Sequence, residues 1–152
     1  MSTAPRFGRL LSFSGALTLC VSLALPMPVL AAAPSEDSAQ ELYTKASAKY
    51  SAADYESAIE LFTAALEKAT AEDLSYKVRG ALLFNLARSH VKAYEEITKD
   101  IKNLRSARAI YKRYLDEADE AGGEYGDLTE AKTALEKVER MLEEEEKKAA
   151  DK

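Results

Sequence analysis

After Pro34 the sequence contains no proline, and its glycines are confined to Gly80, the Gly122–Gly123 pair and Gly126. Alanine, leucine, glutamate and lysine dominate this part of the chain. These residues are strong helix formers, and the alternating β-branched and aromatic runs that mark strands are missing. Because proline and glycine are the main local breakers of helices, the chain can change direction at only a few places. We therefore predict an all-α fold.

Residues 1–33 differ from the rest of the chain. They contain Arg6 and Arg9 near the start, an apolar run over 10–25, small residues at the end, and no acidic residue. This three-part layout is typical of a secretory signal peptide, and the apolar run is short for a membrane span. We predict a signal peptide over 1–31.

Cleavage of this leader is expected near Ala31–Ala33, where small residues suit the peptidase, and the protein is then periplasmic or secreted. The alternative is an uncleaved anchor helix, which Pro26 and Pro28 disfavour. Leu19 stands before the only cysteine, Cys20, where a lipobox needs a small residue. We therefore expect neither a lipid anchor nor stable membrane insertion after cleavage.

The mature chain is acidic and has no cysteine. The net charge of the full chain is −5, and it becomes −7 when the leader takes two arginines away. Nucleic-acid affinity comes largely from lysine and arginine against phosphates, so we expect no nucleic-acid partner. Without disulfides, the fold depends on its apolar core.

Hydrophobic periodicity predicts five helices in one domain over 37–142, with a disordered lead-in at 32–36 and a charged, solvated tail at 143–152. The expected helices cover 37–51, 54–69, a third from Thr70–Asp73 to beyond Tyr94, a fourth through 104–118 that ends at Gly122, and a fifth that Asp127 caps. The third helix should bury Leu74, Val78, Ala81, Leu82, Leu86 and Ser89. We place its end near Lys99–Asn103, since Asp100 and Asn103 favour helix caps. The rival is one unbroken helix through this region.

Small and bulky residues recur at fixed helical spacing, with Ala46, Ala58 and Ala65 set against Tyr55 and Phe62. Such alternation fixes how closely two helices approach and at what angle they cross. This pattern resembles a tetratricopeptide repeat, and a looser second copy contains Ala87, Ala107 and Tyr111. The resemblance assigns eight residues to packing within and between repeats: Ala46, Tyr55, Ala58, Phe62, Ala65, Ala87, Ala107 and Tyr111. A generic helical bundle is the alternative.

The resemblance implies a right-handed stack of antiparallel helix pairs, with about two repeats and a C-terminal capping helix. The sequence departs from the family pattern at Ala53, where a turn glycine is usual, at Thr70, where a proline often closes the repeat, and at Tyr114, where a small alanine is usual. In this family the first helices of successive repeats line a concave groove. The corresponding partner-binding residues here are Tyr43, Ser47, Tyr50, Phe84, Asn85, Arg88 and Lys92.

Arg88 and Lys92 lie one helical turn apart, so the pair could hold a carboxylate. The alternative is that Tyr50 and Phe84 belong to the core and that both cations pair with nearby glutamates.

The sequence offers no recognisable catalytic site. His90 is the only histidine and has no companion at metal-ligand spacing, so we expect no metal and no cofactor. The Gly122–Gly126 segment lacks the lysine of a phosphate loop. We expect a non-enzymatic module that binds another protein through a peptide or a helix. The alternative is a structural protein that forms a homodimer through its heptad-like fifth helix.

Overall fold

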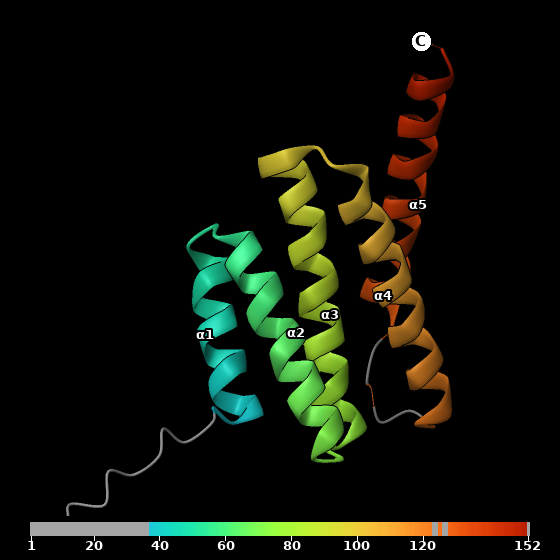
Figure 1. Ribbon diagram of the computed structural model, residues 1–152. Coiled ribbons are helices and arrows are strands. Elements are labelled where there is room, and N and C mark those ends of the chain that lie inside the picture. Colours follow the sequence, from blue (N-terminus) through green and yellow to red (C-terminus); the bar gives the residue numbers. More distant parts are fainter. Residues whose placement is uncertain (1–36, 123–124, 126–127, 152) are drawn as a thin grey trace, which may run out of the picture. The chain divides into compact units, whose positions relative to one another are not determined.

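The computed structural model describes residues 37–122, 125 and 128–151. This part of the chain contains five α-helices, one π-helical turn and no strand (Figure 1). The elements are α1 (Ala39–Ser51), α2 (Tyr55–Ala71), α3 (Tyr76–Ala93), the π-helical η1 (Tyr94–Thr98), α4 (Ile101–Glu120) and α5 (Thr129–Ala150). The prediction of an all-α fold is confirmed. The predicted signal peptide and lead-in, residues 1–36, lie outside the described residues.

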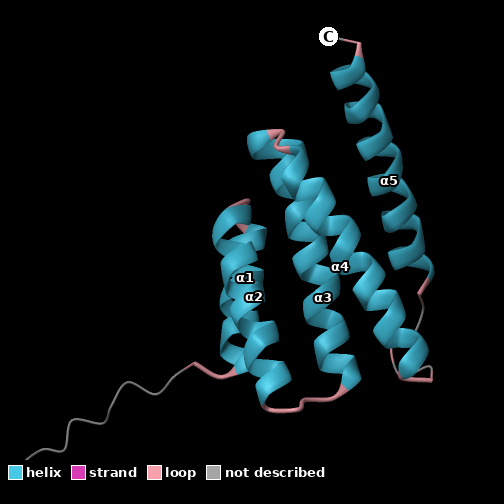
Figure 2. Ribbon diagram, turned by 45° about the vertical axis from the view of Figure 1, so that its right-hand side comes forward, coloured by secondary structure: helices cyan, strands magenta, loops and turns pink. Residues whose placement is uncertain are grey.

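Each helix packs mainly against the helix that precedes or follows it in the chain (Figures 1 and 2). Short turns join α1 to α2 and α3 to α4, so each of these pairs is antiparallel, and α5 returns along α4. None of the helices in the described ranges combines the length and hydropathy needed to cross a bilayer.

The core lies where small residues let neighbouring helices approach. All eight residues that the repeat pattern assigned to packing are buried, and Ala46, Ala58, Ala65, Ala87 and Ala107 are each 0% exposed. Phe62 and Tyr111, each at most 2% exposed, fill the space beside these alanines. A fully buried alanine marks a point at which no larger side chain would fit without displacing a helix.

The first turn is set by local capping. Ser38 and Glu41 form a capping box at the start of α1: the Glu41 amide donates to Ser38 Oγ (3.2 Å), and the Ser38 amide donates to the Glu41 carboxylate (2.9 Å). Asp54 caps α2 by accepting from the Ser57 amide. Between the two helices Ala53 has a φ of 58°, in the left-handed region that favours glycine.

The predicted start of the third helix at Thr70–Asp73 is wrong. Helix α2 continues to Ala71, because the Thr70 hydroxyl donates to the Leu66 carbonyl within its own helix (2.8 Å) and does not cap a new one. Asp73 has a φ of 49° and lies in the turn. Helix α3 begins only at Tyr76.

Two side chains expected inside α3 lie on its surface. Val78 is 40% exposed, and Ala81 is also exposed. Both line a hollow between α1 and α3, whereas Leu82, Leu83 and Leu86 are buried in the core. Leu74, expected on the same inner stripe, is half-buried in the turn before α3.

The third turn lies where we placed it. Helical structure continues past Tyr94 as η1 and ends at Lys99, which has a φ of 50°. Asp100 caps α4 by accepting from the Lys102 amide (2.9 Å), and Asn103 donates to Thr98 Oγ1 (3.2 Å). The alternative of one unbroken helix through this region is wrong.

The last helix starts later and ends later than expected. Helix α4 ends at Glu120, and Gly122 follows with a φ of 61°. The N-cap of α5 is Leu128, without a side-chain hydrogen bond, and the expected cap Asp127 lies outside the described residues. The predicted tail 143–152 is not separate from the domain, because α5 remains helical to Ala150. Most of its side chains beyond Leu142 are nevertheless exposed.

Candidate functional site

Three neighbouring hollows lie along α3 and are here together named the α3 groove. Lys77 and Ala81 line both the first and the second hollow, whereas Phe84, Arg88 and Glu130 line both the second and the third. From Lys77 to Lys92 the groove is about 22 Å long at 1.5 Å per helical residue.

Side chains of α1 and α5 complete the walls of the groove. Helix α1 contributes Tyr43 to the first hollow and Tyr50 to the third. Helix α5 contributes Ala134, Lys137 and Val138 to the third. The groove therefore lies on the face that α1, α3 and α5 share.

The predicted binding residues gather on this face. Tyr43 lines the first hollow and Asn85 the second, and the third contains Tyr50, Phe84, Arg88 and Lys92. The Asn85 amide donates to the Ala81 carbonyl (2.8 Å) and, at 3.5 Å, to the Tyr43 hydroxyl of the neighbouring helix. Ser47 is half-buried on α1 and lines none of the three hollows.

The aromatic side chains of the groove are held by other rings. Tyr43 meets Phe62 edge to face, with ring centroids 5.7 Å apart, and Tyr50 meets Tyr55 at 5.4 Å. Tyr43, Tyr50 and Phe84 are half-buried, so one part of each ring packs in the core and another remains accessible. Rings fixed in this way offer contact area at little cost in side-chain entropy.

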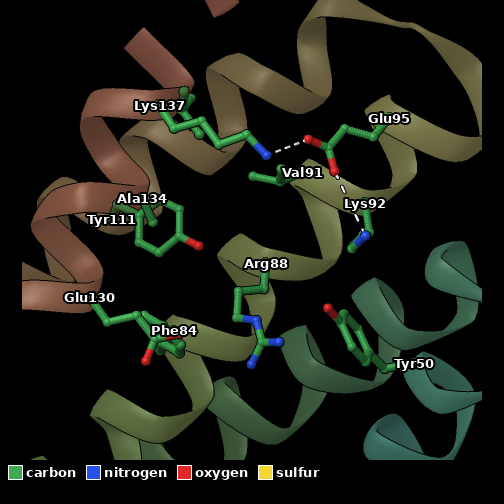
Figure 3. Close-up of a pocket in the computed structure, with 11 residues that line it drawn as sticks. Tyr50, Phe84, Arg88, Val91, Lys92, Glu95, Tyr111, Glu130, Ala134 and Lys137 are labelled. Carbon is green, nitrogen blue, oxygen red and sulfur yellow. Dashed lines mark hydrogen bonds and ion pairs between the residues drawn. The ribbon is translucent and has the colours of Figure 1, made fainter. Parts of the chain in front are cut away.

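The basic side chains of the third hollow differ in their partners (Figure 3). Lys92 Nζ lies 2.8 Å from Glu96 and 3.8 Å from Glu95. Its hydrogen bond with Glu96 raises the pKa of Lys92 and lowers that of Glu96. Lys137 of α5 also reaches Glu95, at 2.6 Å. Both lysines therefore already form ion pairs with the glutamates of η1.

Arg88 has no acidic partner among the described residues. Its guanidinium lies over the rings of Tyr50 and Phe84, 5.4 and 5.7 Å from their centroids. The two residues of the predicted carboxylate-binding pair therefore differ. Lys92 forms ion pairs within the chain, whereas Arg88 remains available to a ligand.

Tyr111 of α4 forms part of the floor of the same hollow. Its ring packs edge to face against Phe84 at 5.8 Å, and the residue is only 2% exposed. Burial raises the pKa of the Tyr111 hydroxyl, so this group stays protonated. The resemblance assigns Tyr111 to packing alone, and its position on the buried stripe of α4 gives no sign that its hydroxyl reaches a groove.

Glu130 and Lys137 were also absent from the predicted site. They lie on α5, and the placement of that helix beside α3 depends on the connection after Gly122. The heptad-like spacing in α5 identifies the face of the helix that is buried. It does not show which other helix lies near its exposed face. No pattern in the sequence could have placed these two residues at the groove.

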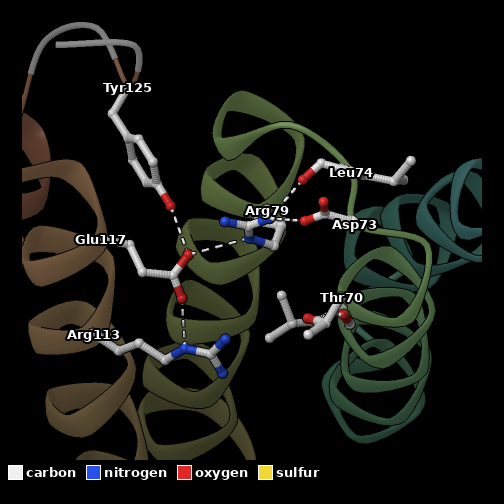
Figure 4. Close-up of polar contacts among 8 residues, drawn as sticks. Thr70, Asp73, Leu74, Arg79, Arg113, Glu117 and Tyr125 are labelled. Atoms are coloured by element: carbon white, nitrogen blue, oxygen red, sulfur yellow. Dashed lines mark hydrogen bonds and ion pairs between the residues drawn. The ribbon is translucent and has the colours of Figure 1, made fainter. Parts of the chain in front are cut away.

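Glu117 joins α3, α4 and the following segment (Figure 4). Its carboxylate accepts from Arg113 Nε (2.8 Å), the Tyr125 hydroxyl (2.9 Å) and Arg79 Nε (3.4 Å). Burial alone would raise its pKa, but the hydrogen bonds from Arg113 and Tyr125 outweigh burial, and the pKa is lowered. A carboxylate with three donors is well satisfied, so we assign it a structural role.

His90 is also engaged within the chain. Its Nδ1 lies 2.9 Å from Asn103 Oδ1, and burial lowers its pKa. Within the described ranges, no three His, Cys, Asp or Glu side chains gather closely enough to hold a metal ion.

The chain matches no protein-family model, no curated protein and no solved structure. Its resemblance to tetratricopeptide repeats therefore remains a prediction from the residue pattern. Any function has to be inferred from the groove and its side chains.

Proposed function

We propose that the protein is an exported, non-catalytic binding module of the tetratricopeptide type. Its partner is another protein, which lays an extended segment or a helix along the α3 groove. The observation that carries the proposal is the row of three hollows, with shared lining residues, along the face that α1, α3 and α5 share. That is the face on which the resemblance puts the concave binding surface.

The dimensions and the chemistry of the groove support a polypeptide ligand. About six or seven residues of extended chain would span its length, at roughly 3.3 Å per residue. The first hollow, beside Leu74 and Val78, is mostly apolar, whereas Arg88 offers a charge in the third. Aromatic and arginine side chains often contribute most to the binding free energy of protein interfaces.

Self-association through the fifth helix is less well supported. The heptad-like residues that suggested it pack inside the chain: Ala131, Val138 and Leu142 are buried, and Leu128 and Leu135 are half-buried against the core. A second copy could not use this stripe without displacing α4, its main neighbour.

Site-specific crosslinking in intact cells tests the proposal. A photoreactive amino acid replaces Ala81 in the groove or, as the matched control, Ala109. Both alanines are exposed, and Ala109 lines a separate hollow between α2 and α4. We expect a partner to crosslink at position 81 and not at 109, and Arg88→Glu to remove the crosslink. Equal capture at both positions, or capture that Arg88→Glu leaves unchanged, would contradict the proposal.

Export is tested separately by cell fractionation. We expect the full chain in the periplasmic or extracellular fraction, shortened by the leader. Replacing the apolar run of residues 10–25 with polar residues should retain the uncleaved protein in the cytoplasm. Detection of uncleaved wild-type protein in the membrane would instead favour the anchor-helix alternative.

A further inference from the structure

The third hollow of the α3 groove contains a cation without an acidic partner. Lining it are three basic residues and two acidic ones, in a chain whose net charge is −5. Glu95 and Glu96 of η1 pair with the two lysines, whereas Arg88 lies over aromatic rings, and Glu130 is the remaining acidic residue of the lining. A guanidinium held against aromatic rings keeps its N–H donors free for a planar anion.

The hollow also contains a tyrosine hydroxyl without a hydrogen-bond partner among the described residues. Tyr111 forms no hydrogen bond there, although it is 98% buried. No side-chain polar atom in this part of the chain is both fully enclosed and unpaired, so the Tyr111 oxygen must reach the open space of the hollow. Figure 3 shows this hydroxyl directed into the hollow from α4. Because this hydroxyl reaches the hollow, it can donate a hydrogen bond to a ligand that enters there.

The size and walls of the hollow limit what can enter. Its volume is about 210 Å³, below the 300 Å³ or more that is typical of pockets for small-molecule ligands. Val91 of α3 and Ala134 and Val138 of α5 provide an apolar wall. The hollow therefore suits one side chain that has an apolar stem and a charged end.

We propose that this hollow receives a glutamate side chain of the partner segment. The methylene groups of the glutamate lie against Val91, Ala134 and Val138. Its carboxylate accepts hydrogen bonds from the Arg88 guanidinium and the Tyr111 hydroxyl. A main-chain carboxylate has no such stem, so a chain terminus would have to bring its backbone into the hollow. The inference rests on the proposed binding function of the groove and specifies the chemistry of its ligand.

A titration with small blocked amino acids tests the hollow itself. The probe is N-acetyl-glutamate amide, which presents one side-chain carboxylate, and N-acetyl-glutamine amide is its neutral counterpart. N-acetyl-alanine presents a main-chain carboxylate instead. Nuclear magnetic resonance of the labelled protein follows the Arg88 Nε–H signal. We expect the glutamate probe to bind at least tenfold more tightly than the glutamine probe and more tightly than N-acetyl-alanine.

Three variants assign the interaction to its residues. Arg88→Gln should weaken binding of the glutamate probe by about tenfold or more, because it removes a charge-assisted hydrogen bond. Tyr111→Phe keeps the ring and should weaken binding by roughly three- to tenfold. Arg105→Gln, at an exposed arginine of α4 that lines none of the three hollows, should leave binding unchanged. Circular dichroism verifies that each variant is folded.

Several results would overturn the inference. Equal binding of the glutamate and glutamine probes would exclude charge recognition, and tighter binding of N-acetyl-alanine would assign the hollow to a chain terminus. Undetectable binding, or binding that Arg88→Gln leaves intact, would remove the hollow as a carboxylate site.

A second experiment separates this inference from the proposed function. Glutamates in the partner segment that crosslinks at position 81 are replaced by glutamine. If the crosslink persists unchanged, the glutamate inference fails and the groove function stands. If the protein with the photoreactive residue at position 81 gives no crosslink with the unaltered partner, the proposed function itself fails.

Discussion

At the residue scale, Ala53 lies in a conformation that a glycine would adopt more easily. Its φ of 58° places it in the left-handed region, where the β-carbon of an L-residue is crowded. The first turn therefore keeps the backbone shape that the family pattern suggests but lacks the usual glycine. Two capped helices, α1 and α2, hold the strained residue in place.

Ala53→Gly should stabilise the protein by about 0.5–1 kcal/mol, because relief of left-handed strain exceeds the added entropy of the unfolded chain. Urea unfolding followed by circular dichroism measures the change. Ala52→Gly is the matched control, since Ala52 is equally exposed but has an ordinary φ of −85°. The control should give no stabilisation. A gain of the same size at both positions would argue against strain at Ala53.

His90 should make stability depend on pH in the mildly acidic range. Burial lowers its pKa below the ordinary value of 6.5. As the pH falls through 6.5, the unfolded chain therefore takes up a proton that the folded chain does not, and stability decreases. His90→Gln should flatten the stability profile between about pH 7 and pH 5.5. Parallel wild-type and variant profiles would show that His90 titrates alike in both states.

The carboxylates affect a lower pH range. The pKa values of Asp54, Glu96 and Glu117 are lowered in the folded protein, so the stability they contribute is lost only below their ordinary values. They would not mask the effect of the histidine.

At the element scale, a glycine of α3 makes room for the segment between α4 and α5. A β-carbon on Gly80 would lie 2.6 Å from Tyr125 Cε1 and 2.8 Å from Cδ1. The Tyr125 ring packs against Tyr114 and donates its hydroxyl to Glu117. Gly80 thus gives up helix propensity to seat this ring.

A double-mutant cycle should reveal this coupling. In a Tyr125→Ala background, Gly80→Ala should stabilise the protein by about 0.5–1 kcal/mol, the usual gain in a helix interior. In the wild-type background the same change should bring no gain, because the ring must shift and its bond to Glu117 is disturbed. Urea unfolding of the four proteins measures the coupling. If the effects of the two substitutions on the free energy of unfolding are additive, Gly80 and Tyr125 are not coupled.

The sequence predicted the ends of helices well where a single capping side chain determines where the helix begins. Asp54 and Asp100 cap α2 and α4 as their types suggest, and the bounds of α1 and α2 were predicted within two residues. The start of α3 was missed because the Thr70 hydroxyl can bond either forward as a cap or back to its own helix. In the structure the hydroxyl bonds back to the Leu66 carbonyl, and the neighbouring Ala69 is buried.

The predicted site followed from the resemblance to tetratricopeptide repeats, which implies that one face of the first and third predicted helices binds the partner. Six of its seven residues line the α3 groove. The contribution of α5 could not be predicted, because it depends on how that helix returns along α4. The exposure of Val78 was missed for a similar reason: an apolar residue on a groove and one in a core look alike in sequence.

At the scale of the whole molecule, one part of α5 packs against the core and its C-terminal part is exposed to solvent. Val138 and Leu142 are at most 3% exposed, whereas most side chains after Leu142 face solvent. The helix therefore contributes apolar burial between Ala131 and Leu142, and its charged end adds little to the core.

Two truncations test this division. Ending the chain after Glu145 should lower the free energy of unfolding by less than about 0.5 kcal/mol, because exposed residues contribute little. Ending it after Arg140 also removes Met141 and Leu142 and should cost roughly 2–4 kcal/mol, as loss of a buried leucine usually does. Urea midpoints compare the two. A large loss from the shorter deletion would mean that the charged end contacts the core side of the domain.

Because each helix packs mainly against its neighbours in sequence, the structure also determines how the chain would unfold under a pulling force. A force that draws the two ends apart would peel the outer helices away one after another, since few strong contacts join helices distant in sequence. The same arrangement favours rapid folding, because most contacts close short loops. It would also let an inserted helix pair lengthen the groove while the existing ends keep their own packing.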